Sequence, residues 1–142
     1  MKEGSIKPSF TNVEYKTTKG QDAIDLYKST TQALMEWQEE QIKGIMALDG
    51  DVWQYMKYGI CVSRRNGKGE ILAAREFIGI IELGEKICHT AHRTTTSHDA
   101  FVRLYTLLKK AGYEEHSKKK KEMPPQSFFA SKQYGLEHIE IS

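Results

Sequence analysis

An eight-residue polar stretch carries the residue types that bind phosphate: Ser63-Arg-Arg-Asn-Gly-Lys-Gly-Glu70. It lies between a short apolar segment and a segment with helical periodicity, so we expect it to open onto the N-terminus of a helix. Such a terminus offers backbone N–H groups and the positive end of the helix dipole to an anion. Gly67 and Gly69 let the backbone curl closely around phosphate oxygens, and Lys68 supplies a point charge. The stretch therefore predicts a phosphate-binding loop.

The loop departs from the usual P-loop pattern, G-x-x-x-x-G-K-[ST], at two positions. The pattern requires a glycine at Val62 and a hydroxyl residue at Gly69, so only Gly67-Lys68 matches. Without the hydroxyl, one protein contact to Mg²⁺ is missing, and Glu70 or water would have to replace it. An Asn-Gly turn in a basic hairpin is the alternative interpretation of the same residues.

Two arginines, Arg64 and Arg65, stand directly before the Asn-Gly-Lys sequence of this loop. One interpretation is that they are solvated surface charges. The other is that they stabilise charge on a transferring phosphoryl group or sense its loss. The sequence leaves both roles open.

The segments that position this loop alternate between strand and helix patterns. Residues 58–62 form a short apolar, β-favouring run, which predicts a buried strand, and residues 86–91 predict a second one. Residues 70–83 have helical periodicity and end before Gly84, and another helix is predicted from a cap at Thr96 or Ser97 to Ala111-Gly112. This order is a βαβα unit, which is typical of an α/β fold with a parallel sheet and right-handed crossovers.

Helices precede the βαβα unit. Residues 1–20 are polar and predict an extended arm, whereas residues 21–48 have apolar side chains at spacings of three and four. That spacing predicts two amphipathic helices broken near Ser29–Thr31, where hydroxyl residues can cap the second helix. Turn residues at Leu48–Asp51 should end it.

The C-terminal part is predicted to be a charged loop followed by one strand. Residues 114–126 read as a solvated loop, and the lysines at 118–121 are more often solvated than bound to DNA. Residues 134–141 alternate as an exposed or edge strand does.

Composition fits a single soluble domain. The 142 residues include 39% apolar and 28% charged residues, and the net charge is +2, which alone does not imply nucleic-acid binding. No run approaches the ~18 apolar residues of a membrane span, and the first ten residues lack the apolar centre of a secretory signal. Cys61 and Cys88 lie in apolar runs and predict reduced thiols in a cytosolic protein.

Cys88, His89, His92 and His98 superficially resemble a metal-binding cluster. However, strand residues three apart point to opposite faces, so His89 and His92 would diverge. Cys-x-x-Cys spacing is absent as well. We therefore predict no metal site among these residues.

Three motifs in order resemble the start of phage terminase large subunits, the ATP-driven motors that package phage DNA into empty capsids. They are Trp37-Gln38 on a helix, the run Ile60–Ile71, and Ile87–His92 with Ser97 and Ala100-Phe101. The resemblance extends from about Gly20 to the C-terminus. That family has an N-terminal ATPase domain of the additional-strand P-loop type and a C-terminal nuclease domain. The resemblance implies that residues 21–142 are the N-terminal portion of such an ATPase domain, with residues 1–20 as an arm.

The resemblance also implies ATP with Mg²⁺ as the cofactor. Trp37-Gln38 matches the adenine-recognition element of the family, although core packing is the commoner role of such a tryptophan. Residues 63–69 match the deviant Walker A loop, with Lys68 on the phosphates and Arg64 as an electrostatic helper. The implied binding residues are Trp37, Gln38, Ser63, Arg64, Arg65, Asn66, Gly67, Lys68, Gly69 and Glu70.

By the same resemblance, the partners are double-stranded viral DNA, the terminase small subunit, the portal protein or a complementary terminase fragment, in the cytoplasm of the host cell. The Walker B aspartate, the catalytic glutamate and the nuclease carboxylates of the family have no counterpart in this sequence. We therefore expect weak nucleotide binding at most and no turnover. The alternatives are a non-enzymatic protein- or DNA-interaction module derived from a terminase, and a helicase-like P-loop NTPase fragment.

Overall fold

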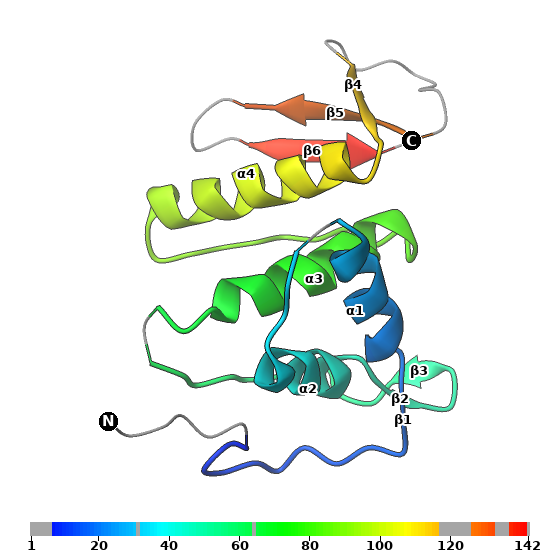
Figure 1. Ribbon diagram of the computed structural model, residues 1–142, viewed down its shortest axis with the longest axis vertical. Coiled ribbons are helices and arrows are strands. Elements are labelled where there is room, and N and C mark those ends of the chain that lie inside the picture. Colours follow the sequence, from blue (N-terminus) through cyan, green and yellow to red (C-terminus); the bar gives the residue numbers. More distant parts are fainter. Residues whose placement is uncertain (1–6, 31, 64, 117–125, 133–136, 142) are drawn as a thin grey trace. The chain divides into compact units, whose positions relative to one another are not determined.

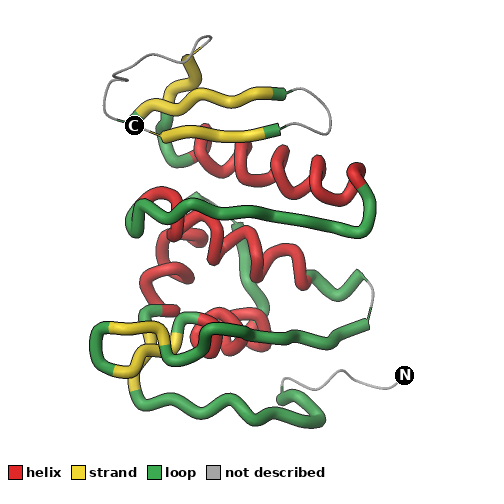
Figure 2. The backbone as a smooth tube through the Cα atoms, turned by 180° about the vertical axis from the view of Figure 1, so that it is seen from behind, coloured by secondary structure: helices red, strands yellow, loops and turns green. Residues whose placement is uncertain are grey.

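The computed structural model describes residues 7–30, 32–63, 65–116, 126–132 and 137–141. In these residues the fold is mixed α/β, with four helices and two small three-stranded sheets (Figures 1 and 2). The chain divides into two compact units, Met1–Arg75 and Glu76–Ser142. Each unit contains one of the sheets, and helix α3 (Lys68–Ile81) spans the division.

The first unit contains the two predicted N-terminal helices, α1 (Gly20–Ser29) and α2 (Glu36–Ile45), and confirms the break between them. Ala23, Ile24 and Tyr27 of α1 and Ile42 of α2 are fully or almost fully buried, as their spacing predicts. The predicted capping role was wrong. The hydroxyl of Thr30 donates to the Tyr27 carbonyl at 2.6 Å, as does the Thr30 N–H at 3.2 Å, and so closes α1, because carbonyls at a helix C-terminus receive no donor from a following turn.

A small antiparallel sheet combines the end of the N-terminal arm with two short strands that follow α2. Its strands are β1 (Thr17–Thr18), β2 (Ala47–Asp49) and β3 (Val52–Trp53), in that order. Gly50 lies between β2 and β3 with a left-handed φ of 63°, so the predicted turn is present. It joins two strands instead of ending a helix, because α2 already ends at Ile45 and the helix predicted to reach residue 48 gives way to β2. The hydroxyl of Thr18 donates to the Lys43 carbonyl at 2.6 Å and fastens the arm to the end of α2.

The two buried strands predicted at 58–62 and 86–91 are wrong, because neither segment pairs in a sheet in the structure. An apolar run shows that a segment favours burial, but only pairing with a distant segment makes it a strand. Here Cys61 and Cys88 are exposed rather than buried. The predicted parallel βαβα unit is therefore not formed by the described residues.

Both predicted central helices are confirmed, with earlier starts: α3 begins at Lys68 and α4 (Thr94–Lys110) at Thr94. Gly84 stops α3 as predicted, since it adopts a left-handed φ of 63° just beyond the helix end. The predicted cap of α4 was wrong. Arg93 occupies the cap position, and Ser97 lies in the first turn, where its hydroxyl donates to the Thr94 carbonyl at 3.0 Å.

The second unit adds a mixed sheet of β4 (Glu114–His116), β5 (Ser127–Ser131) and β6 (His138–Ile141). Strand β5 is central in the described sheet, parallel to β4 and antiparallel to β6. The edge strand predicted at 134–141 is thus confirmed over 138–141, while residues 134–136 lie outside the described residues. The sequence did not predict β5, and β4 replaces the start of the predicted loop. Lys118–Lys121 lie outside the described residues.

Helix α4 contacts this sheet through an aromatic pair and a polar cluster. The rings of Tyr105 and Phe128 meet edge to face, with centroids 5.5 Å apart. The Tyr105 hydroxyl also donates to Glu115 of β4. Burial opposes ionisation of Glu115, but the hydrogen bonds from Tyr105 and Lys132 and the positive charges of Lys132 and Lys109 together outweigh that effect and lower the pKa of this carboxyl. None of the helices in the described residues combines the length and the apolar character needed to cross a membrane.

Helices α1 and α2 are in close contact at Gly20. A Cβ at Gly20 would lie 2.5 Å from Cα and 2.8 Å from the backbone N of Lys43, and backbone atoms cannot move aside cheaply. We expect Gly20→Ala to lower the free energy of unfolding by about 1–2 kcal/mol, because overpacking outweighs the better helix propensity of alanine. Urea unfolding measures this change. Gly59→Ala is the control, since nothing lies within 4 Å of a Cβ there; equal effects of the two substitutions would contradict the prediction.

Candidate phosphate-binding site

The predicted loop residues come together at the N-terminus of α3. The helix begins at Lys68, two residues earlier than predicted, so Lys68, Gly69 and Glu70 belong to its first turn. The first residues of an α-helix have backbone N–H groups with no acceptor in the preceding turn. Lys68 therefore stands at the positive end of the helix rather than in the middle of the loop. Arg64 lies outside the described residues.

The backbone turns sharply just before the helix. Arg65 and Gly67 both have left-handed φ values, 62° and 82°. Glycine adopts this conformation without strain, whereas for arginine it costs on the order of 1 kcal/mol or more. The side-chain amide of Asn66 donates to the Ser63 hydroxyl and, at 3.3 Å, to the Ser63 carbonyl, which closes the turn. The side chains of Ser63, Arg65, Asn66 and Lys68 are exposed, so the cations can reach an anion from solvent.

Gln38 holds this loop from the side. Its side chain is only 2% exposed. Its amide oxygen accepts a hydrogen bond from the Met35 N–H at 2.7 Å, and its amide nitrogen donates to the Gly67 carbonyl at 2.8 Å. The two contacts tie the start of α2 to the start of α3. A Cβ at Gly67 would lie 2.5 Å from the Gln38 amide nitrogen, so the site requires glycine for space as well as for conformation.

This geometry gives Gln38 a structural role. The sequence resemblance assigned Gln38 to the adenine edge, but here the amide is buried and both its ends are bound to the backbone. Gln38 is thus a residue that positions the loop in this arrangement. Trp37, the preceding residue of α2, is half-buried rather than part of the core.

The carboxylate of Glu70 is also engaged within the protein. It accepts a hydrogen bond from the hydroxyl of Tyr27, a residue of α1 that is 1% exposed. A carboxylate in the first turn complements the helix dipole. For Glu70 to bind Mg²⁺ instead, this contact would have to be given up. Sequence reasoning missed Tyr27, whose position on the apolar face of α1 predicted only core packing.

The histidines pair with carboxylates. His89 contacts Glu76, and the Nδ1 atom of His98 lies 2.6 Å from a carboxylate oxygen of Glu137. Within the described ranges, no three His, Cys, Asp or Glu side chains are grouped so that they could hold a metal ion. His92 is exposed and precedes α4 and its cap residue Arg93.

Comparison with known proteins identifies no relative of this chain. The chain matches no family model, no curated protein and no solved structure. The assignment of a ligand to the loop therefore rests on its residues, their geometry and the resemblance of the motifs.

The bridge made by Gln38 can be tested by removing its hydrogen bonds while keeping its volume. We expect Gln38→Met to lower the free energy of unfolding by about 1–2 kcal/mol, because the Met35 N–H loses its acceptor and the Gly67 carbonyl keeps only the hydrogen bond from the Glu70 N–H. Chemical denaturation of the wild type and of the variant measures this free-energy difference. The control is Gln21→Met on α1, where an exposed amide donates to Asp25 at 2.9 Å and the change should stay within about 0.5 kcal/mol. A loss at Gln38 no larger than at Gln21 would refute the bridge.

Proposed function

We propose that residues 63–70 bind the phosphates of ATP, and that the chain forms the N-terminal part of a P-loop ATPase domain of the phage terminase type. One observation carries the proposal. Lys68 is the first residue of a 14-residue helix and directly follows a loop with left-handed backbone at Arg65 and Gly67. This places a cation, a helix dipole and a tightly curled backbone at one point, which is the combination that favours a phosphate group.

Each residue of the proposed site has a distinct task. The backbone N–H groups at the start of α3 donate to phosphate oxygens, and Lys68 and Arg65 neutralise their charge. Gly69 leaves the approach to the helix clear of a side chain. Gln38 positions the loop through the Gly67 carbonyl. In this proposal Arg64 supplies further positive charge to the phosphates.

The residues present fit phosphate better than they fit Mg²⁺. Position 69 offers no hydroxyl, and the Glu70 carboxylate is bound to Tyr27. Mg²⁺ would therefore be held mainly by the phosphates and water, and would neutralise phosphate charge when bound. Hydrolysis requires a further acidic group to position the attacking water. The proposal for this chain is thus nucleotide binding; ATP hydrolysis, DNA translocation and contacts with viral DNA, the small subunit and the portal are proposed from the resemblance alone.

The alternative functions make different predictions about nucleotide binding. A helicase-like P-loop protein would bind ATP through the same loop, so the geometry does not separate it from a packaging motor. A non-enzymatic interaction module would show no response to nucleotide. Ligand binding therefore decides between the two classes.

We expect millimolar ATP·Mg²⁺ to raise the thermal unfolding temperature of the chain and Lys68→Ala to abolish the increase. A ligand at ten times its Kd stabilises the folded state by about 1.4 kcal/mol, so even weak binding is measurable. Inorganic tripolyphosphate should also stabilise the protein, whereas adenosine should not, because the proposed contacts are to phosphate. Lys57→Ala removes another exposed lysine of the first unit, outside the loop, and should respond as the wild type does.

Two results would contradict the proposed function. The first is an unchanged unfolding temperature of the wild type in ATP·Mg²⁺ and in tripolyphosphate, which would favour the interaction module. The second is an equal increase in the wild type and in Lys68→Ala, which would place the phosphates elsewhere.

A further inference from the structure

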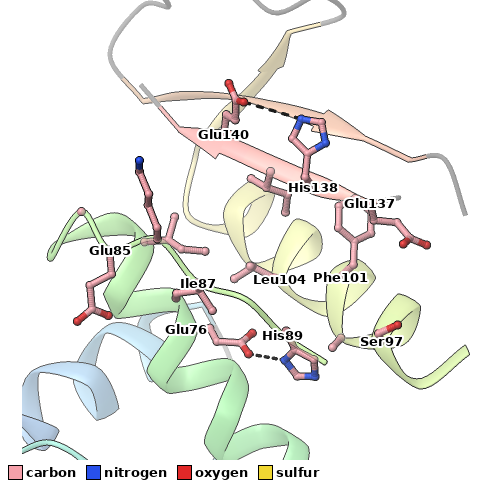
Figure 3. A pocket seen from close by; sticks show the side chains of 15 residues that line it. Glu76, Glu85, Ile87, His89, Ser97, Phe101, Leu104, Glu137, His138 and Glu140 are labelled. Carbon is pink, nitrogen blue, oxygen red and sulfur yellow. Dashed lines mark hydrogen bonds and ion pairs between the residues drawn. The ribbon is translucent and has the colours of Figure 1, made fainter. Parts of the chain in front are cut away.

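The second unit contains a pocket of about 630 Å³ that shares no residue with the phosphate loop. Its walls come from the end of α3, the uncoiled stretch 84–89, one face of α4 and strand β6 (Figure 3). All of these lining residues belong to the second unit. The volume is typical of sites for small organic molecules, which enclose roughly 300–1,000 Å³.

The middle of the pocket is apolar. Ala100, Phe101 and Leu104 are spaced by one and three residues along α4, so they share the face that lines the pocket, and Ile87 and Ile139 add aliphatic side chains from other walls. In Figure 3 the side chains of Ile87, Leu104 and Phe101 lie between β6 and the Glu76–His89 pair. A ligand that covers these side chains removes apolar surface from water, which favours binding.

The wall formed by α4 is also aromatic. The ring of Phe101 stacks on that of His98 and is tilted against that of Tyr105, with centroids 6.3 Å apart in both pairs. Aromatic rings gain more from packing on one another than their buried area alone provides. This wall therefore favours an aromatic ligand over an aliphatic one.

The Glu76–His89 pair provides the polar contact. Glu76 of α3 contacts Nδ1 of His89, and the two side chains are only 14% and 24% exposed. An ionised carboxylate accepts hydrogen bonds but cannot donate them, so the Nδ1 hydrogen faces Glu76. Within the part of the chain that the structure describes, Nε2 of this ring has no hydrogen-bonding partner. The pair thus orients the imidazole and leaves Nε2 for a ligand.

The other acidic and hydroxyl side chains of the lining already have partners within the protein. They are Glu85, Glu137, Glu140 and Ser97. Because their contacts would have to be exchanged before a ligand could use them, the chemistry of the ligand follows from His89 and the apolar walls.

We propose that this pocket binds a small neutral aromatic molecule that carries a hydroxyl group. The hydroxyl bonds to Nε2 of His89, and it suits either state of the ring, because it donates to a neutral imidazole and accepts from a protonated one. The aromatic body packs on Phe101 and against Leu104 and Ile87. This site is independent of nucleotide binding.

The direct test is a fluorescence titration of 2-naphthol with the chain, next to 2-methylnaphthalene, which has a methyl group in place of the hydroxyl. His89→Phe keeps a ring but removes its hydrogen bond. We expect this change to weaken binding of 2-naphthol about threefold to tenfold, as the loss of one hydrogen bond does, and not to weaken binding of 2-methylnaphthalene. His92→Phe is the matched control, since His92 is exposed and does not line the pocket, and it should leave both affinities unchanged.

The wild-type chain provides a test that needs no variant. In nuclear magnetic resonance, 2-naphthol should shift the amides of residues 84–89, 100–104 and 138–140 and the Nε2 signal of His89. The hydrocarbon 2-methylnaphthalene should shift the same amides but leave Nε2 nearly unchanged. The proposal therefore stays testable even if circular dichroism shows that His89→Phe fails to fold.

Four outcomes would overturn the proposal. The first is no response to 2-naphthol up to its solubility limit. The second is equal weakening of both probes by His89→Phe, which would remove the hydrogen bond. The third is a set of shift changes outside the lining segments, which would place the ligand elsewhere. The fourth is tighter binding of 2-naphthoate than of 2-naphthol, which would replace the hydroxyl with a carboxylate.

Discussion

The buried amide of Gln38 is the contact on which the candidate site depends. It joins two backbone groups that are far apart in the chain, the Met35 N–H at the start of α2 and the Gly67 carbonyl just before α3. Because the side chain is 2% exposed, both of its polar ends need partners, and these two groups supply them. The bridge fixes the point at which the loop enters the helix. Lys68 consequently lies at the positive end of α3, where phosphate binding is favoured.

The helices could be predicted from the sequence because their signals are local. Apolar spacing located all four, and Gly84 marked the end of α3. Strands depend on partners that periodicity does not reveal, so the apolar runs at 58–62 and 86–91 were misread as strands. Strand β5 was missed for the same reason, since its pairing with β4 and β6 is visible only in the fold.

The candidate site was predicted in part. The loop residues are contiguous, so their residue types and the helix that follows were enough to place them together. Its supporting contacts are not contiguous: Tyr27 meets Glu70 across 43 positions, and Gln38 meets Gly67 across 29. Sequence reasoning likewise did not predict the pocket of the second unit, because its lining residues come from β6, α4 and the stretch 84–89. The family resemblance implied a base-reading role for Gln38, whereas the hydrogen bonds of its amide to Met35 and Gly67 are visible only in the fold.

Nuclear magnetic resonance of the ¹⁵N-labelled chain, titrated with ATP·Mg²⁺, tests the central claim most directly. If the loop binds phosphate, the largest amide shift changes fall on Gly67, Lys68 and Gly69, because their N–H groups lie at the start of α3. Tripolyphosphate should shift the same amides. Shift changes confined to other segments, or none at millimolar nucleotide, would contradict the assignment.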